Sequence, residues 1–99
     1  MNVMMVRAKV RADSAAEVEA AARAMFAAIE KAQPQGVRYA SCLLPDGVTF
    51  VALLALDDGG GNPLPAVPEF RQFQDDLKDW VAEPPALEPL TVVGSYRLF

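Results

Sequence analysis

The sequence contains no histidine and a single cysteine, Cys42, among its 99 residues. The absence of histidine removes the commonest zinc ligand and the usual proton shuttle near neutral pH. It also excludes the Ser-His and Cys-His pairs that activate a nucleophile. One cysteine cannot form a disulfide within the chain, which favours a reducing compartment. We expect Cys42 to be a small, buried apolar residue.

A long apolar run and a basic tract are also missing. No stretch approaches the roughly 20 apolar residues that a membrane-spanning helix needs. The basic residues of the first eleven positions follow an apolar start, which is the reverse of a signal peptide. The formal net charge is −4, so non-specific binding to nucleic acid or to anionic membranes is not expected. We therefore predict a cytoplasmic protein, folded as one domain over residues 1–99, with no nucleic-acid or membrane partner.

What the sequence does contain is a strand that is apolar on both faces. Residues 49–56 carry no charge and lie between an Asp-Gly and an Asp-Asp-Gly turn signal. Alternate side chains of a strand point to opposite faces, so the run divides into two sets. Val51, Leu53 and Ala55 fall on one side, and Phe50, Ala52, Leu54 and Leu56 on the other. This pattern is typical of a central strand that is covered on both faces.

Periodicity predicts five further elements around this central strand. They are a strand over residues 4–12, a helix over residues 14–32, a strand over residues 37–44, a helix over residues 69–81 and a last strand over residues 90–99. The first strand has one apolar face and one basic face. A Pro-Asp-Gly turn leads from the second strand directly into the central strand, so these two strands should form an antiparallel hairpin.

The resulting element order is β-α-β-β-α-β. With right-handed crossovers, this order predicts a ferredoxin-like α+β sandwich, in which a four-stranded antiparallel sheet of strand order 4-1-3-2 carries both helices on one face. The helices would cover only one side of the central strand. Its other apolar side then needs a partner, most simply the same face of a second subunit. We therefore expect a homodimer in which two sheets face each other as a dimeric α/β barrel.

The element order and the two-sided central strand resemble the dimeric α/β-barrel superfamily. That superfamily includes antibiotic-biosynthesis monooxygenase-like proteins, muconolactone isomerase-like proteins and stress-responsive barrel domains. Residues 62–65 (Asn-Pro-Leu-Pro), 68–70 (Pro-Glu-Phe) and 92–97 (Val-Val-Gly-Ser-Tyr-Arg) also resemble small actinobacterial proteins of unassigned function. The resemblance includes no catalytic motif, so it bears on fold rather than on activity. It implies a homodimer whose inter-sheet or helix–sheet cavity holds a small, mostly apolar molecule.

Other proteins with this topology are distinguished by their chemistry. An RNA-recognition module displays aromatic residues on its third strand for base stacking, whereas this strand has only Phe50 among aliphatic residues. A metallochaperone needs two thiols after the first strand, where Arg-Ala-Asp-Ser stands here. Haem-binding barrels of the superfamily usually supply a histidine. We therefore expect no metal site and no cofactor.

Candidate ligand-binding residues occur on the predicted strands. Arg7 and Lys9 share the basic face of the first strand, and the last strand should lie beside it and bring Arg97 near. Converging cations could hold a carboxylate or enolate of a ligand, although a solvated or acid-paired strand face is the alternative. Tyr39 and Tyr96 could donate protons or hydrogen bonds, or could simply pack.

Two classes of function remain open. The first is a non-catalytic dimer that binds a small, mostly apolar or anionic molecule, or a partner protein, without a cofactor. The alternative is a cofactor-independent monooxygenase or isomerase acting on an enolisable aromatic or polyketide-like compound, whose anion a base or cation would stabilise. The sequence identifies no catalytic residues. A closed apolar pocket with Arg or Tyr at its wall would favour an enzyme, and a barrel filled by side chains would favour a structural dimer.

Overall fold

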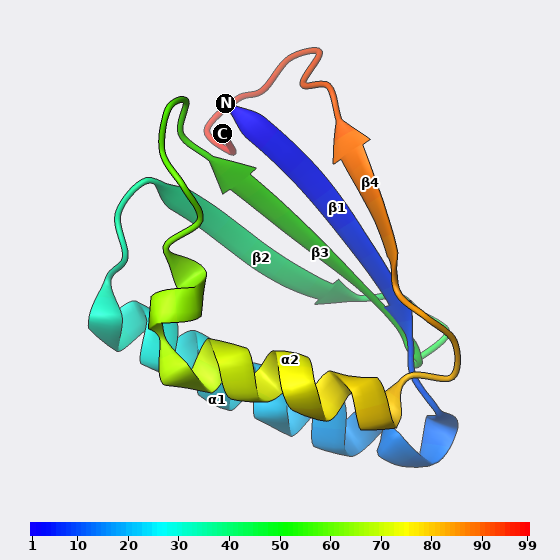
Figure 1. Ribbon diagram of the computed structural model, residues 1–99. Helices are drawn as coiled ribbons and strands as arrows, with labels where there is room; N and C mark the ends of the chain where they lie inside the picture. Colours follow the sequence, from blue (N-terminus) through cyan, green and yellow to red (C-terminus); the bar gives the residue numbers. More distant parts are fainter.

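A computed structural model describes residues 1–99 and contains one four-stranded antiparallel sheet and two α-helices (Figure 1). The elements are β1 (Asn2–Lys9), η1 (Ala12–Ser14), α1 (Ala15–Ala32), β2 (Val37–Leu43), β3 (Thr49–Leu56), η2 (Leu64–Ala66), α2 (Pro68–Trp80) and β4 (Ala86–Leu90). The strand order is β2-β3-β1-β4, and every neighbouring pair is antiparallel. Read from the other edge, this is the predicted order 4-1-3-2. The predicted ferredoxin-like α+β fold is therefore confirmed.

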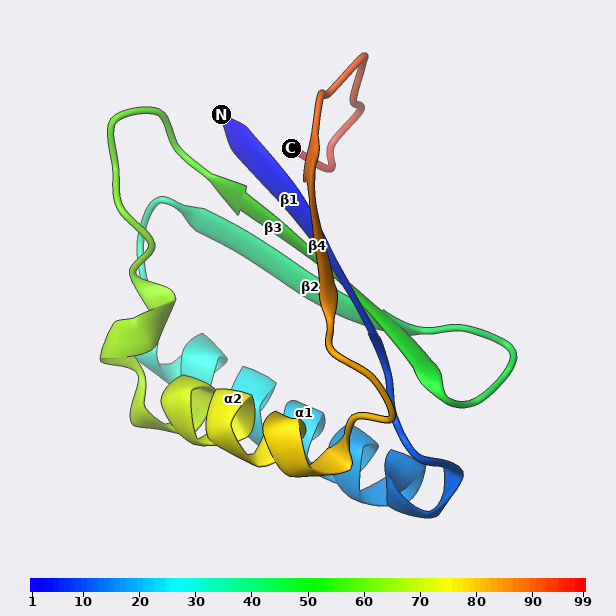
Figure 2. The same cartoon turned by 45° about the vertical axis from the view of Figure 1, so that its right-hand side comes forward.

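Both helices lie on the same side of the sheet, and the other side is left uncovered by helices (Figure 2). The strand register aligns residues of like orientation into rows. One row on the helix-facing side runs Ser41–Ala52–Val6–Leu87 across all four strands. The neighbouring residues of each strand point the opposite way, onto what we call the open face. Its central residues are Met5, Arg7, Ala40, Cys42, Val51, Leu53 and Glu88.

The layer between helices and sheet is only partly filled. The largest fully buried side chains are Met25, Leu64, Val10 and Val18, and 11 of the 99 residues are buried. Helix α2 has no fully buried residue. Its apolar side chains still face inward, since the ring of Phe70 lies 6.0 Å from that of Tyr39 in an edge contact. Neither helix combines the length and the apolar character that crossing a bilayer requires.

The predicted last strand over residues 90–99 is wrong, because β4 covers Ala86–Leu90 instead. A bridge between Val10 and Val81 and a hydrogen bond from the Ala82 amide to the Lys9 carbonyl hold the chain beside the end of β1. From there it runs antiparallel along β1, and Leu90 already pairs with Val3. Because β1 starts at Asn2, almost none of its residues remain for residues 91–99 to pair with. They form no strand.

Residues 91–99 form a tail that crosses one end of the open face. The chain leaves β4 at Leu90, on one edge of the sheet, and Arg38 of β2, on the other edge, donates a hydrogen bond to the Leu98 carbonyl at 3.3 Å. The register row between these two residues holds Val3 and Ala55, which are 5% and 1% exposed. The course of the tail accounts for the burial of these two side chains.

The expectation that Cys42 is buried is also wrong, since its side chain is exposed. Cys42 lies on the edge strand β2 and pairs with Val51 only, because no strand lies on the outer side of β2. On the open face it has no helix above it. An edge position on an uncovered face explains the exposure.

Candidate functional site

A cavity of about 180 Å³ lies between the two helices and the sheet. Nine of its twelve lining residues are hydrophobic, and none is charged. The lining residues are Val6, Ala8, Val18, Tyr39, Ser41, Phe50, Ala52, Phe73, Gln74, Leu77, Pro85 and Leu87. A concave, mostly apolar space with a few polar groups is the usual form of a small-molecule site.

Small side chains on adjacent strands make the floor of this cavity. Ser41 of β2 pairs directly with Ala52 of β3, and Ala8 of β1 lies one register step away, opposite Phe50. Side chains of this size rise little above the sheet. The space that leucine or isoleucine would fill at these positions therefore stays open under the helices.

Aromatic and aliphatic side chains make the walls and the roof. Phe73 and Leu77 are separated by four residues on α2, so they stand on the same face of the helix, directed at the sheet. Val18 of α1 completes the roof and is 1% exposed. Tyr39 and Phe50, from β2 and β3, provide aromatic surfaces at the side of the floor. The helices therefore hold apolar surface above a floor of small residues.

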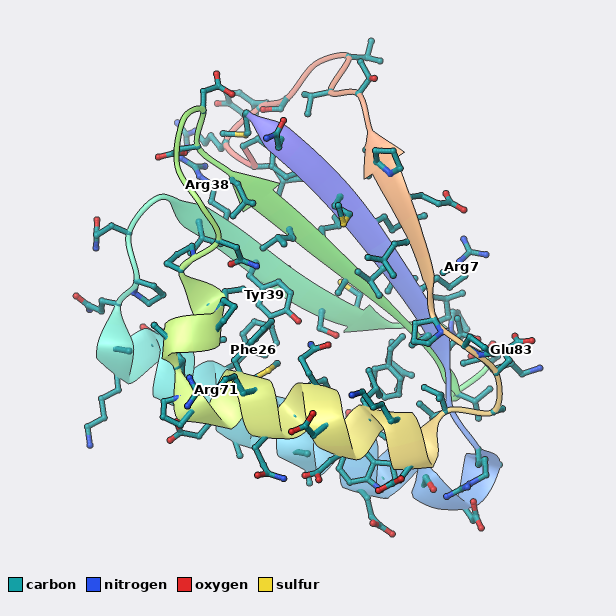
Figure 3. The ribbon with its side chains drawn as sticks, viewed as in Figure 1. Arg7, Phe26, Arg38, Tyr39, Arg71 and Glu83 are labelled. Atoms are coloured by element: carbon teal, nitrogen blue, oxygen red, sulfur yellow. The ribbon has the colours of Figure 1, made fainter.

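Tyr39 is the polar side chain most firmly placed at the cavity. Figure 3 shows it extending from β2 into the space between sheet and helices, next to Phe26 of α1. Its ring stacks on Phe26 at a centroid distance of 5.0 Å, and no side-chain hydrogen bond of the chain involves its hydroxyl. Burial raises the pKa of the Tyr39 phenol. At neutral pH it is an uncharged donor without a protein acceptor.

The chemistry available inside the cavity is hydrogen bonding. Tyr39, Ser41 and Gln74 are its polar lining residues, and carboxylate, amine and imidazole groups are all absent from the lining. No group of three or more His, Cys, Asp or Glu side chains in the chain is arranged to hold a metal ion. The cavity can orient an uncharged molecule and can stabilise a developing negative charge on oxygen, but it holds no base.

Two wider grooves adjoin the cavity. One, of about 670 Å³, shares Ser41 and Phe50 with it and is also lined by the charged residues Glu19, Arg23 and Glu30 of α1. The other, of about 530 Å³, shares Gln74, Leu77 and Pro85 with it. Both grooves are more open to solvent than the cavity. We place the site in the smaller cavity because it is the least open of the three, and shelter from solvent, rather than volume, removes a ligand's apolar surface from water.

The predicted basic residues lie elsewhere. Arg7 and Lys9 are exposed on the open face, and neither forms an ion pair. They line a hollow of about 330 Å³ together with Asp46, Thr49 and Glu83. Figure 3 shows Arg7 and Glu83 on the side of the molecule near β4. Any ligand in the helix–sheet cavity is therefore separated from these cations by the sheet itself.

Asp46 organises the turn before β3 rather than a ligand site. The Val48 and Thr49 amides both donate to its Oδ1 at 2.9 Å, and the Thr49 hydroxyl donates to Oδ2 at 2.6 Å. These hydrogen bonds, that of the Thr49 hydroxyl first, lower the pKa of the Asp46 carboxyl. The carboxylate is thus engaged by its own turn.

Arg97 and Tyr96 lie in the tail and not beside Arg7. The Arg97 guanidinium carbon stands 5.2 Å from the centroid of the Tyr96 ring, and Tyr96 is 82% exposed. The adjacent Leu98 contacts Arg38 at the far edge of the sheet, whereas Arg7 pairs with Ala86 of β4. The expected convergence of Arg97 with the basic strand face is therefore wrong. It depended on a last strand over residues 90–99.

Sequence reasoning missed most of the residues that form the cavity. Phe73 and Leu77 belong to the helix predicted over residues 69–81, but neither they nor the small residues of the floor were singled out as lining a cavity. A usable signal did exist, because Ser41, Ala52 and Ala8 fall on one face of three neighbouring strands once the register is known. Gln74 gave no signal, since an isolated glutamine on a helix is ordinary surface.

Comparison with solved structures finds the same architecture in other proteins. A candidate antibiotic biosynthesis monooxygenase from Nitrosomonas europaea superposes with a TM-score of 0.75 at 21% identity, covering 95% of this chain and 100% of that one. The chain has the fold of the antibiotic biosynthesis monooxygenases. SnoaB, a cofactor-independent oxygenase from Streptomyces nogalater, gives a TM-score of 0.70 at 18% identity, covering 97% of this chain and 96% of that one.

The monooxygenase fold does not by itself carry one function. A protein of unknown function from Nitrosomonas europaea matches equally well, with a TM-score of 0.75 at 12% identity over 96% of this chain and 91% of that one. No family model matches the sequence, and a search of curated proteins finds no relative. At these identities the comparisons bear on the fold alone.

Proposed function

We propose that this protein binds a small, mostly apolar molecule in the cavity between its helices and its sheet. The observation that carries the proposal is the partly enclosed space of about 180 Å³, lined by nine hydrophobic residues and by no charged residue. A chain that needed only stability would gain by filling this space, since close packing is the rule in protein interiors. Of the five residues proposed from the sequence, we assign the ligand-binding role to Tyr39, which lines the cavity.

We further propose that the protein is a homodimer through the open face. The two inner strands place Met5, Leu53 and Val51 on that face, only half-buried in the single chain, with the charged residues Arg7 and Glu88 beside them. Five of the eight exposed large hydrophobic residues lie between Leu90 and Leu98, at the end of β4 and in the tail. A second copy placed on this face would cover a surface that a soluble monomer rarely leaves exposed. The cavity lies on the opposite side of the sheet, so the dimer would leave it accessible.

A second candidate is a cofactor-independent monooxygenase or isomerase acting on an enolisable aromatic compound. Its support is the shared fold with SnoaB and with other proteins described as monooxygenases. In such an oxidation, one oxygen atom of O₂ becomes a carbonyl on the reacting carbon, and the other leaves as water with two hydrogens of that carbon. No external reductant is needed. Tyr39 could stabilise the oxyanion that develops in this step.

Binding can be tested by blocking the cavity. Ala52→Leu places three additional carbon atoms above the floor, whereas Ala24→Leu adds the same atoms at an exposed position of α1 outside the cavity. We expect toluene to shift the NMR signals of cavity residues in the wild type and in Ala24→Leu, but not in Ala52→Leu. Equal toluene binding by all three proteins, or by none, would contradict the proposal.

Catalysis needs a separate assay. Oxygen consumption with resorcinol, an enolisable compound with a single ring, measured with and without the protein and with Ala52→Leu as the blocked control, distinguishes the two candidates. Oxygen uptake that follows protein concentration and disappears on blocking supports the oxygenase. Toluene binding without oxygen uptake from any enolisable compound tested favours the non-catalytic binder.

A further inference from the structure

We infer that the occupant of the helix–sheet cavity is an uncharged compound with a single aromatic ring and a hydrogen-bond acceptor, and that the hydroxyl of Tyr39 donates to this acceptor. The inference rests on the proposed function, that the cavity binds a small molecule. It adds the size, the charge and the polar group of that molecule. Each of these comes from a different property of the lining.

The volume of the cavity limits the size of the ligand. A cavity of 150 Å³ lined by aliphatic and aromatic residues accommodates benzene, and the cavity here measures about 180 Å³. One ring with a small substituent therefore fits. A fused system of two or three rings would exceed this volume and would have to extend into the adjoining grooves, whose linings include charged residues. Polycyclic polyketide-like compounds, which the sequence left open, are too large for this space.

The lining favours a flat ring over an aliphatic chain. Tyr39, Phe50 and Phe73 come from β2, β3 and α2, so aromatic surfaces bound the cavity from both layers. Aromatic pairs prefer offset-stacked or edge-to-face arrangements, and each contributes beyond the area that it buries. A ligand ring among these residues can adopt such contacts with more than one of them.

The absence of charge in the lining excludes an anionic ligand. A buried carboxylate without a cationic partner is costly, because the cavity would replace its water with apolar groups. Arg7 and Lys9 point to the other side of the sheet, and Lys78 lines the neighbouring groove rather than the cavity. An anion would be better placed in the open hollow beside Arg7 and Lys9.

Tyr39 is the reason that the ligand needs a hydrogen-bond acceptor. Its hydroxyl has no hydrogen-bond partner among the side-chain hydrogen bonds of the chain, and the residue is half-buried, with its hydroxyl still in contact with water. A ligand that displaces water from this donor must supply an acceptor in its place, since leaving the donor unpaired in the complex costs more than pairing it gains. A carbonyl or a methoxy oxygen on the ring would meet the requirement.

Three probes with a single ring test these properties by NMR titration at pH 7. Acetophenone has the ring and an uncharged acceptor, toluene has the ring alone, and benzoate has the ring and a negative charge. We expect acetophenone to bind about 5-fold more tightly than toluene, as one neutral hydrogen bond implies. Benzoate should bind at least about 100-fold more weakly than acetophenone. 2-Acetonaphthone, with a second fused ring, should bind at least about tenfold more weakly than acetophenone.

A matched pair of variants then assigns the donor. Tyr39→Phe removes the cavity hydroxyl, and Tyr96→Phe removes the exposed hydroxyl of the tail. We expect Tyr39→Phe to abolish the 5-fold preference for acetophenone over toluene, and Tyr96→Phe to leave it intact. Because the Tyr39 hydroxyl supports no hydrogen bond of the fold, both variants should keep the wild-type melting temperature.

The outcomes separate this inference from the proposed function. If benzoate or 2-acetonaphthone binds as well as acetophenone, or if Tyr39→Phe keeps the preference, while Ala52→Leu still blocks toluene, the ligand class is wrong and the binding site stands. If no probe binds, or if all bind equally to Ala52→Leu, both the inference and the proposed function fail.

Discussion

Replacing Ala52 by leucine tests most directly whether the space between helices and sheet is a void. Ala52 lies in the middle of β3, lines the cavity and is only half-buried. Leucine adds three carbon atoms, and each buried methylene contributes ~0.8 kcal/mol, which gives an upper limit of ~2.4 kcal/mol. A buried leucine loses ~0.5–1 kcal/mol of rotamer entropy. We therefore expect the free energy of unfolding to rise by about 1.5 kcal/mol.

The same strand provides the control. Ala55 lies three residues further along β3, points to the open face and is 1% exposed, so no free space surrounds it. Ala55→Leu makes the same chemical change where the atoms are already packed. Overpacking of this kind typically costs about 1–3 kcal/mol. The two variants should thus change stability in opposite directions, although they differ from the wild type by the same atoms.

Urea denaturation at one fixed protomer concentration measures both effects, since the stability of a dimer depends on concentration. In a thermal scan, each kcal/mol should move the melting temperature by about 4–8 °C for a domain of this size. Ala52→Leu should melt above the wild type and Ala55→Leu below it. If Ala52→Leu loses as much stability as Ala55→Leu, the space beside Ala52 is already filled in solution, and the reasoning that led to a ligand site is refuted.

Three further predictions concern the open face and the two groups with shifted pKa values. Light scattering after size exclusion should give about twice the chain mass of 10.7 kDa for the wild type. The Leu53→Lys variant should give the monomer mass while keeping the circular dichroism spectrum of the wild type. A monomeric wild type would exclude the dimer. Because burial raises the pKa of Tyr39, its contribution to stability should be present below the usual tyrosine pKa near 10 and should be lost as pH rises through the folded-state pKa. Absorbance at 295 nm should show a late-titrating tyrosine that Tyr39→Phe removes, and its persistence in that variant would assign the shift to another residue. The lowered pKa of Asp46 has the opposite sign, so the stabilisation that it provides should be present above the usual Asp pKa near 4 and should be lost as pH falls through the folded-state pKa. Asp46→Asn should lower the melting temperature at pH 7 and flatten its fall in acid, and identical pH profiles for the two proteins would contradict this role.

The sheet could be predicted from the sequence because its signals are local and periodic. The two apolar sets of residues 49–56 placed β3 in the centre, and the Pro-Asp-Gly turn fixed the β2–β3 hairpin. Helix α2 was placed to within one residue at each end, since a proline starts it and its apolar stripe repeats at helical spacing. Right-handed crossovers then determined the order of the strands.

The last strand could not be predicted because its position depends on contacts distant in sequence. Residues 90–99 alternate like a strand, whereas residues 86–90 include Pro89 and Glu88. The bridge between Val10 and Val81 sets where the chain begins to follow β1, and this decides the pairing before the local pattern of the tail can act. Pro89 is tolerated because β4 is an edge strand.

The same dependence on register explains why the candidate site was only partly predicted. Tyr39 could be named from its residue type, but its partners in the cavity come from β1, β3, β4 and both helices. The period of two in β1 is the decisive feature. It directs Val6 and Ala8 into the cavity and Arg7 and Lys9 out of it. Cations that looked central in the sequence are thereby separated from the ligand by the thickness of the sheet.

Binding and catalysis in this cavity differ in one requirement, which is a base. An enolisable ring must lose a proton before its carbon can react with oxygen, and no lining residue can accept that proton at neutral pH. The raised pKa of Tyr39 keeps its phenol protonated, so it can stabilise an oxyanion but cannot generate one. A substrate would then have to ionise in water before it bound. An ionised ring is the species that the uncharged lining excludes most strongly. Catalysis would thus require an ionised substrate, whereas the lining of the cavity favours an uncharged one. This conflict within one protomer favours a binding role for the cavity over a catalytic one.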